Sequence, residues 1–463
     1  MEQHSIKSEL PFSRFFQWFS SPTVTRLGGL SVFLIACLTF LLPAARNANP
    51  GAPPEAGDGP DYDNLAVELS KGNGFSFNWD DPEFRSPYEA HINDGRYDYL
   101  LDRQGAWTTA LKPPLFPFLM ALDYKIFGRH FGVIRVMNSI FMALSVAMAF
   151  MIIARSFGVG PGILCTALLL LDYRFPPYAT LVLTEAVTCL LVMAMLWCLL
   201  RTVETRSRRW ACILGVVTAV AFLARNPLVL WVPVLAIPVL AFSVPEGERV
   251  GFRALGLPSL FIAMFLLVAA PWMIRNCVLL GGFEPLGTMS VDLPAGFSDK
   301  AVGQNGVWFN MYETRGTKAK PGETRYYDRV PTEGSSLVEQ ELIRSRRGKA
   351  EAVEWALQNP AKVVLLAWLK IRSEWRPIGL RQTLLLVFAA LGLVFLLRRA
   401  RREAAVFFCI LAACTLSIAI TWSVGGRFIV PVLPVVIGLS SVGMWSFVTL
   451  ATEFTARHKR RSA

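Results

Sequence analysis

The chain has 463 residues, of which 53% are apolar and only 17% are charged, a composition that excludes a disordered protein and an ordinary soluble one. The 46 Lys and Arg residues outnumber the 34 Asp and Glu residues, which gives a net charge of +12. In a membrane protein such an excess usually lies in cytoplasmic loops, so we expect membrane lipids and no nucleic acid as partners.

Ten apolar runs are candidates for helices that cross ~30 Å of hydrocarbon. They occupy residues 27–45, 136–154, 158–171, 178–200, 210–224, 228–244, 254–274, 382–397, 404–424 and 428–452. The third run is the shortest. We therefore predict an all-α polytopic membrane protein with about ten transmembrane helices.

Clusters of arginine and lysine follow the fourth, eighth and tenth runs and set the predicted orientation. The positive-inside rule places these clusters, and with them both termini, in the cytoplasm. If residues 113–127 or 361–375 also crossed the membrane, an arginine cluster would fall on the wrong side. We therefore predict that both segments form interfacial helices on the outer surface. The long polar lead before the first run predicts a retained signal-anchor and not a cleaved signal peptide.

These assignments divide the chain into five parts. They are a cytoplasmic N-terminal segment (1–26), an N-terminal transmembrane catalytic module (27–274) with the first outer loop (46–133), a second outer loop with an interfacial helix (275–381), C-terminal transmembrane helices (382–452) and a basic cytoplasmic tail (453–463).

The first outer loop carries the leading candidates for acid–base chemistry. Its residues 46–111 contain 12 acidic and five basic side chains. Asp61 and Asp63 stand near the start of an amphipathic stretch, where a carboxylate is either a general base or a helix cap. A further carboxylate, Glu185, lies inside the fourth apolar run and must pair or bind something; Asp172 is the alternative in the same region.

Several basic residues stand at helix ends on the predicted outer side, where the positive-inside rule gives no reason for them. If they converge, they suit a phosphate or pyrophosphate group; otherwise each anchors its own helix at the interface. They are Lys112, Arg174, Arg225, Arg275, Arg372, Arg376 and Arg427. The spacing of Cys and His predicts no disulfide framework, metal site or cofactor.

Five segments, in the same order along the chain, resemble the membrane glycosyltransferases of the GT-C fold, which include protein O-mannosyltransferases and the lipid A aminoarabinose transferase. They are Asp61-Tyr62-Asp63-Asn64-Leu65-Ala66, Lys112-Pro113-Pro114, Thr184-Glu185, Pro271-Trp272-Met273-Ile274-Arg275 and Arg427-Phe428-Ile429-Val430-Pro431. The resemblance implies a sugar donor linked to polyprenyl phosphate and an active site that faces the periplasm or exterior.

The resemblance also implies roles for individual residues. Asp61 takes the position of the catalytic base and Glu185 that of the second acidic residue. The residues that face the donor phosphate are Lys112, Arg225, Arg275 and Arg427. The family pattern has a pair of acidic residues directly before the tyrosine, whereas here Gly59 and Pro60 precede Asp61 and the other carboxylate, Asp63, follows Tyr62. Asp63 therefore stays open as the alternative base.

The sequence therefore favours an integral glycosyltransferase of the cell (inner or plasma) membrane, in which an Asp base and basic phosphate ligands transfer a sugar to a lipid, glycan or protein acceptor on the outer face. A flippase or transporter of lipid-linked sugars, which also needs phosphate ligands, is the alternative from another class. A non-catalytic membrane protein of envelope assembly is the third interpretation.

Overall fold

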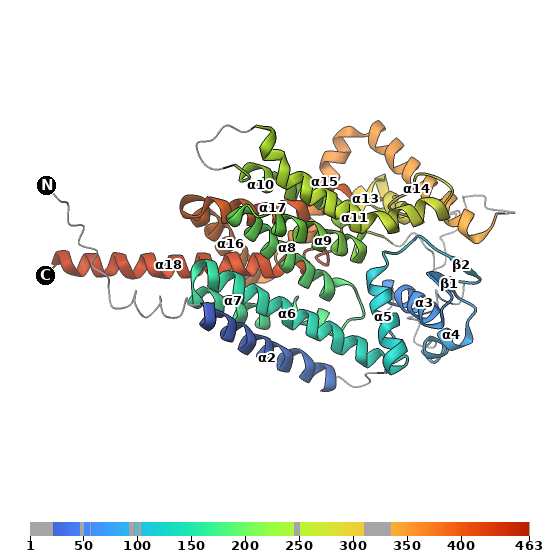
Figure 1. Ribbon diagram of the computed structural model, residues 1–463, viewed down its shortest axis with the longest axis horizontal. Helices are drawn as coiled ribbons and strands as arrows, with labels where there is room; N and C mark the ends of the chain where they lie inside the picture. Colours follow the sequence, from blue (N-terminus) through green and yellow to red (C-terminus); the bar gives the residue numbers. More distant parts are fainter. Residues whose placement is uncertain are drawn as a thin grey trace.

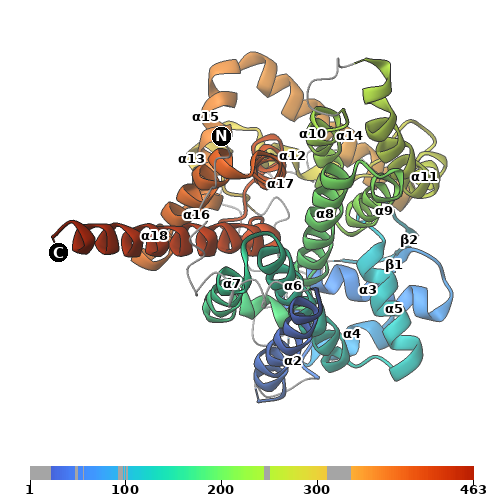
Figure 2. The same ribbon diagram turned by 60° about the vertical axis from the view of Figure 1, so that its left-hand side comes forward.

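A computed structural model describes residues 22–46, 51–55, 57–91, 97, 100, 103–244, 251–309 and 335–462. Most of the predicted N-terminal segment and residues 310–334 of the second outer loop lie outside these ranges. The described residues form a helical bundle with a smaller cap at one end, and the long C-terminal helix projects from the other end (Figure 1, Figure 2).

Each of the ten apolar runs contains a helix. These helices are α2 (Pro22–Arg46), α6 (Phe131–Phe157), α7 (Val159–Leu171), α8 (Glu185–Thr205), α9 (Arg208–Ala224), α10 (Trp231–Ala241), α11 (Gly256–Leu279), α16 (Gly379–Arg399), α17 (Arg401–Ile420) and α18 (Leu433–Ser462). In the part of the chain that the structure describes, seven are long and apolar enough to span a membrane, whereas α7, α9 and α10 are shorter. The chain is a multi-pass membrane protein with a predominantly helical fold.

Two helices begin later than their apolar runs predict. The fourth run starts with a short 3-10 turn, η3 (Pro176–Ala179), so Glu185 is the first residue of α8 and does not lie within it. The tenth run similarly passes through a loop and the 3-10 turn η8 (Val430–Val432) before α18 begins. Pro431 and Pro434, which lack the backbone N–H that a helix interior needs, explain the delay before α18. Before α8, the carbonyl oxygens of Thr180 and Leu181 instead accept hydrogen bonds from the side chains of Arg135 and Asn138.

The segment predicted as the first outer loop folds into the cap. It contains α3 (Asp58–Lys71), β1 (Ser76–Asn78), α4 (Pro82–Glu89), β2 (Ala106–Thr108) and, after it, the predicted interfacial helix α5 (Leu115–Phe127). The two strands pair antiparallel, with Phe77 opposite Trp107, and add a small sheet to the all-α prediction. Gly72 ends α3 with φ of 84°, a left-handed conformation that favours glycine. The cap has its own aromatic core, which includes Trp79, Phe84 and Tyr88.

The second polar segment covers the same end of the bundle. It contains η6 (Met289–Asp292), α12 (Leu293–Gly296), α13 (Asp299–Gly303), α14 (Leu337–Gln358) and the second predicted interfacial helix, α15 (Pro360–Trp375). Ser336 and Glu339 start α14 with a reciprocal capping box. Glu341 of α14 accepts hydrogen bonds from the side chains of Trp107 (2.8 Å) and Thr109 (2.6 Å), so it connects the two long polar segments.

Glycines allow the closest helix contacts in the bundle. A Cβ atom at Gly443 of α18 would collide with the Phe388 carbonyl oxygen of α16, and one at Gly392 of α16 would collide with the Leu439 carbonyl oxygen of α18. Small residues at crossings let helix backbones approach closely in lipid. The α16–α18 crossing therefore depends on the absence of side chains at these two positions.

We expect Gly443→Val to lower the free energy of unfolding by about 1–3 kcal/mol or more, because the added side chain forces the two helices apart. Gly256→Ala is the matched control, since no atom lies within 4 Å of a Cβ at that position. Melting temperatures in detergent measure both changes, and equal values for Gly443→Val and the wild type would refute the role of this crossing.

Candidate functional site

Four charged residues from distant parts of the sequence meet where the cap joins the bundle. Lys112, just before α5, donates to Asp58 at the start of α3 (2.6 Å). Arg427, in the loop before α18, donates to the second oxygen of Asp58 (3.0 Å) and to Glu185 at the start of α8 (2.5 Å). The fold thus joins the first loop, the fourth apolar run and the last loop in one charged cluster.

Asp58 is the carboxylate of this cluster that solvent reaches most easily. Its side chain is 33% exposed, compared with 6% for Asp61 and 0% for Glu185. Burial by itself raises the pKa of Asp58, but the charges and hydrogen bonds of Lys112 and Arg427 hold this pKa well below its usual range. Asp58 is therefore ionised at neutral pH, although these two cations also make it a weaker base than a free carboxylate.

Asp61 and Asp63, the two candidates from the sequence, have different surroundings. Asp61 pairs with Arg103 (2.5 Å) and Lys112 (3.1 Å), so it lies next to Asp58 at the edge of the cluster. Asp63 is fully buried and accepts from Tyr88 (2.7 Å), Tyr124 (2.6 Å) and Arg129 (2.5 Å). These three partners make Asp63 an anchor within the core of the cap.

Glu185 faces two arginines, as its position inside an apolar run predicts. Besides Arg427, it contacts Arg225 at the end of α9, at 3.5 Å. Arg225 also stacks on the ring of Phe428, with 4.5 Å between the guanidinium carbon and the ring centroid. Asp172, the alternative carboxylate, instead accepts from the backbone N–H groups of Arg174 and Phe175 and shapes the turn after α7.

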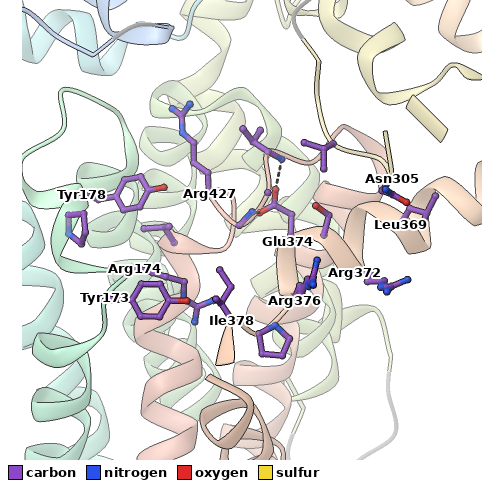
Figure 3. Close-up of a pocket in the computed structure, with 18 of the residues that line it drawn as sticks. Tyr173, Arg174, Tyr178, Asn305, Leu369, Arg372, Glu374, Arg376, Ile378 and Arg427 are labelled. Atoms are coloured by element: carbon purple, nitrogen blue, oxygen red, sulfur yellow. Dashed lines mark hydrogen bonds between the residues drawn. The ribbon is translucent and has the colours of Figure 1, made fainter. Parts of the chain in front are cut away.

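A cavity of about 900 Å³ opens beside the charged cluster. It lies between the α7–α8 connection, the end of α15 and the loop before α18, and Figure 3 shows Tyr178 near Arg427 on one wall. Four of the seven basic residues singled out in the sequence line it: Arg174, Arg372, Arg376 and Arg427. This density of arginine suits an anionic group such as a phosphate.

Arg275 is attached to the first outer loop. Its guanidinium donates to the Thr109 carbonyl oxygen (2.7 Å) and stacks on the ring of Trp272, 4.7 Å from the centroid. Phe75 adds a second aromatic contact at 5.5 Å. These contacts fix the end of β2 against α11, so the geometry gives Arg275 a structural role beside its predicted role in phosphate binding.

Asp292, at the end of η6, is an acidic residue that the sequence reading passed over. Its pKa is raised to about 7, mainly by burial; Lys112 opposes this rise, and the negative charges of Asp58 and Asp61 add to it. Its Oδ1 atom is buried and has no hydrogen-bond partner among the described residues. Asp292 is thus a largely protonated carboxyl below neutral pH, adjacent to the charged cluster.

We expect Asp292→Asn to stabilise the protein above pH 7 by about 2–4 kcal/mol and to have little effect near pH 4. A carboxyl with a raised pKa holds a proton that the unfolded chain loses, so stability falls as the pH rises from about 4 to about 7. The variant lacks this titration. Melting temperatures at pH 5 and pH 8 check the sign, and an equal shift at both values would contradict it.

Sequence reasoning also missed Asp58 and Glu374. Asp58 precedes Asp61 by three residues, a spacing that puts both side chains on one face of a helix and that was available in the sequence. Glu374 is fully buried beside the loop that carries Arg427. Nothing in its local sequence indicates that contact, because the two segments are about 50 residues apart.

Residues 111–274 match the model of the dolichyl-phosphate-mannose-protein mannosyltransferase family. A search of curated protein sequences finds no significant match. The matched range includes Lys112, Glu185 and Arg225, three residues of the site described above.

Solved structures share the fold. ArnT from Cupriavidus metallidurans, bound to undecaprenyl phosphate, has a TM-score of 0.51 and 15% identity over 94% of this chain and 64% of its own. The apo oligosaccharyltransferase of Archaeoglobus fulgidus has a TM-score of 0.53 and 13% identity over 93% of this chain and 52% of its own. AglB from the same organism, in complex with an inhibitory peptide and a dolichol-phosphate, has a TM-score of 0.53 and 13% identity over 96% of this chain and 52% of its own.

The chain spans about half to two thirds of the length of these proteins, and identities this low carry the fold alone. The family match over residues 111–274 agrees with this likeness. The chain therefore has the GT-C fold of polytopic membrane glycosyltransferases, and its residues 111–274 match the mannosyltransferase family model.

Proposed function

We propose that the protein is a membrane glycosyltransferase that moves a sugar from a polyprenyl-phosphate donor to an acceptor hydroxyl of a lipid, glycan or protein on the outer face of the cell membrane. The observation that carries this proposal is the meeting of Asp58, Lys112, Glu185 and Arg427 beside a cavity lined with arginines. A carboxylate next to a phosphate site is what an inverting sugar transfer requires.

In this proposal the donor phosphate enters the cavity and binds Arg427, with Lys112 and Arg225 close to it. An oxygen of the acceptor attacks the anomeric carbon, and the bond from that carbon to the phosphate oxygen breaks. The electron pair leaves with the phosphate, whose charge the arginines stabilise. The acceptor proton passes to a carboxylate of the first loop.

Asp58 is our choice for that carboxylate, and Asp61 is the alternative that the sequence predicts. Asp58 is the more exposed of the two and is held by Lys112 and Arg427, the residues proposed to bind phosphate. A phosphate that shares these cations weakens their hold on Asp58, so donor binding raises its basicity. Asp63 lacks this access because its side chain is fully buried.

We propose Arg275 as a weaker phosphate ligand than Arg427, since its guanidinium already donates to the Thr109 carbonyl oxygen. Two substitutions distinguish phosphate binding by Arg275 from its structural role. Lys retains the charge but loses the planar fork, so a phosphate ligand loses less donor affinity on Arg275→Lys than on Arg275→Ala. Unchanged affinity in both variants would leave Arg275 with its structural role alone.

The test of the proposed function is mass spectrometry of sugar transfer by the purified protein in nanodiscs. Polyprenyl-phosphate sugars serve as donors, and membrane and envelope extracts serve as acceptors. A sugar-modified product that forms with the wild type and not with Asp58→Asn supports the proposal. Movement of the donor lipid between leaflets without any product would support a flippase instead.

A further inference from the structure

The loop before α18 wraps around one buried carboxylate, that of Glu374 near the end of α15. Oε1 accepts from the hydroxyl of Ser423 (3.0 Å) and the backbone N–H of Val424 (2.5 Å). Oε2 accepts from the backbone N–H groups of Gly426 (3.0 Å) and Phe428 (3.0 Å). Figure 3 shows Glu374 at the centre of this arrangement, with Arg427 extending away from it.

These four donors fix the backbone on both sides of Arg427. The residue before it and the residue after it both donate to the same oxygen, Oε2 of Glu374. The loop reaches this shape through Gly425 and Gly426, whose φ values of 68° and 103° lie in the region that favours glycine. Glu374 is only 1% exposed, and a buried carboxylate is tolerated because all four donors satisfy it.

A second residue of α15 fixes the other end of the same connection. Lys370, one helical turn before Glu374, is fully buried and donates to the carbonyl oxygens of Thr421 (2.7 Å) and Ala419 (3.3 Å) at the end of α17. Its ammonium group also lies 3.7 Å from the ring centroid of Phe297. The buried face of α15 thus binds the α17–α18 connection at two points, through Lys370 and through Glu374.

The opposite face of α15 points away from the protein. Val364 and Trp368 are 72% and 61% exposed, as expected for a helix that lies against lipid. A helix with an exposed apolar face therefore holds the loop that presents Arg427 to Asp58 and Glu185.

We infer that Glu374 is a positioning residue that sets the reach of Arg427 toward the donor phosphate. This inference rests on the proposed role of Arg427 in donor binding. Glu374 itself touches the loop and not the reacting groups. Its removal leaves Arg427 charged and present, but releases the backbone that aims its side chain.

The experiment measures the affinity of undecaprenyl phosphate for the full chain in nanodiscs. In Glu374→Gln the amide keeps one acceptor oxygen, but in either orientation its NH₂ group faces at least one backbone N–H donor of the loop. We expect affinity to fall about 10- to 100-fold, the equivalent of one hydrogen bond to a charged group. Glu354→Gln, at an exposed position of α14, is the matched control and is expected to bind as the wild type does.

A double-variant cycle separates positioning from a general structural effect. If Glu374 acts through Arg427, the double variant with Arg427→Ala binds no more weakly than Arg427→Ala alone. The inference would be overturned if the affinity losses of Glu374→Gln and Arg427→Ala were fully additive in the double variant. It would also be overturned if Glu374→Gln bound the lipid as tightly as the wild type. If Arg427→Ala itself binds as the wild type does, the proposed function of Arg427 fails instead.

A milder variant keeps the test valid if Glu374→Gln does not fold. Ser423→Ala removes one of the four donors and leaves the carboxylate in place. We expect it to weaken lipid binding by a smaller factor, and again only when Arg427 is present. Equal weakening in the presence and absence of Arg427 would count against positioning.

Discussion

Replacement of Asp58 by Asn is expected to lower the rate of sugar transfer by about 10²–10⁴-fold, the usual loss when a general base is removed. Asn has nearly the same shape but accepts no proton at neutral pH. Donor binding is expected to persist or to tighten, because the variant removes a negative charge that competes with the phosphate for Lys112 and Arg427. Single-turnover rates and donor affinity, measured separately, check both parts.

Asp61→Asn and Asp63→Asn are the matched controls, since all three carboxylates lie within two turns of one helix. We expect Asp61→Asn to retain more activity than Asp58→Asn. For Asp63→Asn we expect the main effect to be a lower melting temperature, because this variant disrupts the hydrogen bonds from Tyr88, Tyr124 and Arg129. A larger rate loss in Asp61→Asn than in Asp58→Asn would return the base to Asp61.

Replacement of Arg427 by Ala is expected to weaken donor binding and to lower the free energy of unfolding by about 3–5 kcal/mol. Arg427 pairs with Asp58 and with the fully buried Glu185. Its loss leaves a buried negative charge whose remaining cation, among the described residues, is Arg225 at 3.5 Å. Donor affinity and thermal unfolding measure the two effects independently.

A second substitution separates the two effects. Adding Glu185→Gln to Arg427→Ala removes the buried charge that lost its partner, so we expect much of the stability to return. Donor affinity is not expected to return, because the phosphate ligand is still missing. Recovery of both properties would mean that Arg427 affects the donor only through the stability of the fold.

The membrane helices could be predicted from the sequence because lipid imposes a simple rule on length and polarity. All ten apolar runs contain helices, and the two runs predicted not to cross, 113–127 and 361–375, are α5 and α15 at the cap end and on the flank of the bundle (Figure 1). Helix starts were less predictable, since the 3-10 turns before α8 and α18 have the same apolar composition as the helices that follow them.

The basic residues of the site could also be predicted from the sequence. Charged side chains near the bilayer are costly, and the positive-inside rule does not account for those at predicted outer helix ends. Four of the seven line one cavity, and the meeting of Arg427 with Glu185 joins two of the predicted residues. Arg275 shows the limit of the argument. A carbonyl oxygen and two aromatic rings of the fold bind its guanidinium, and no sequence pattern distinguishes that environment from a phosphate.

The carboxylates were harder to rank from the sequence. Asp58, Asp61 and Asp63 lie within six residues, and what separates them is burial and the distant partners Lys112, Arg129 and Arg427. Glu374 shows the same limit, since its four hydrogen bonds all come from residues 423–428. Long-range contacts of this kind have no local signal in one sequence.

The account depends most on the donor phosphate lying in the arginine-lined cavity against Arg427. Cryo-electron microscopy of the full chain in nanodiscs with undecaprenyl phosphate tests this directly. The account predicts phosphate density within hydrogen-bond distance of Arg427 and on the same side as Asp58. Phosphate density elsewhere on the protein, or a bound lipid that leaves the pairs of Arg427 with Asp58 and Glu185 unchanged, would contradict it.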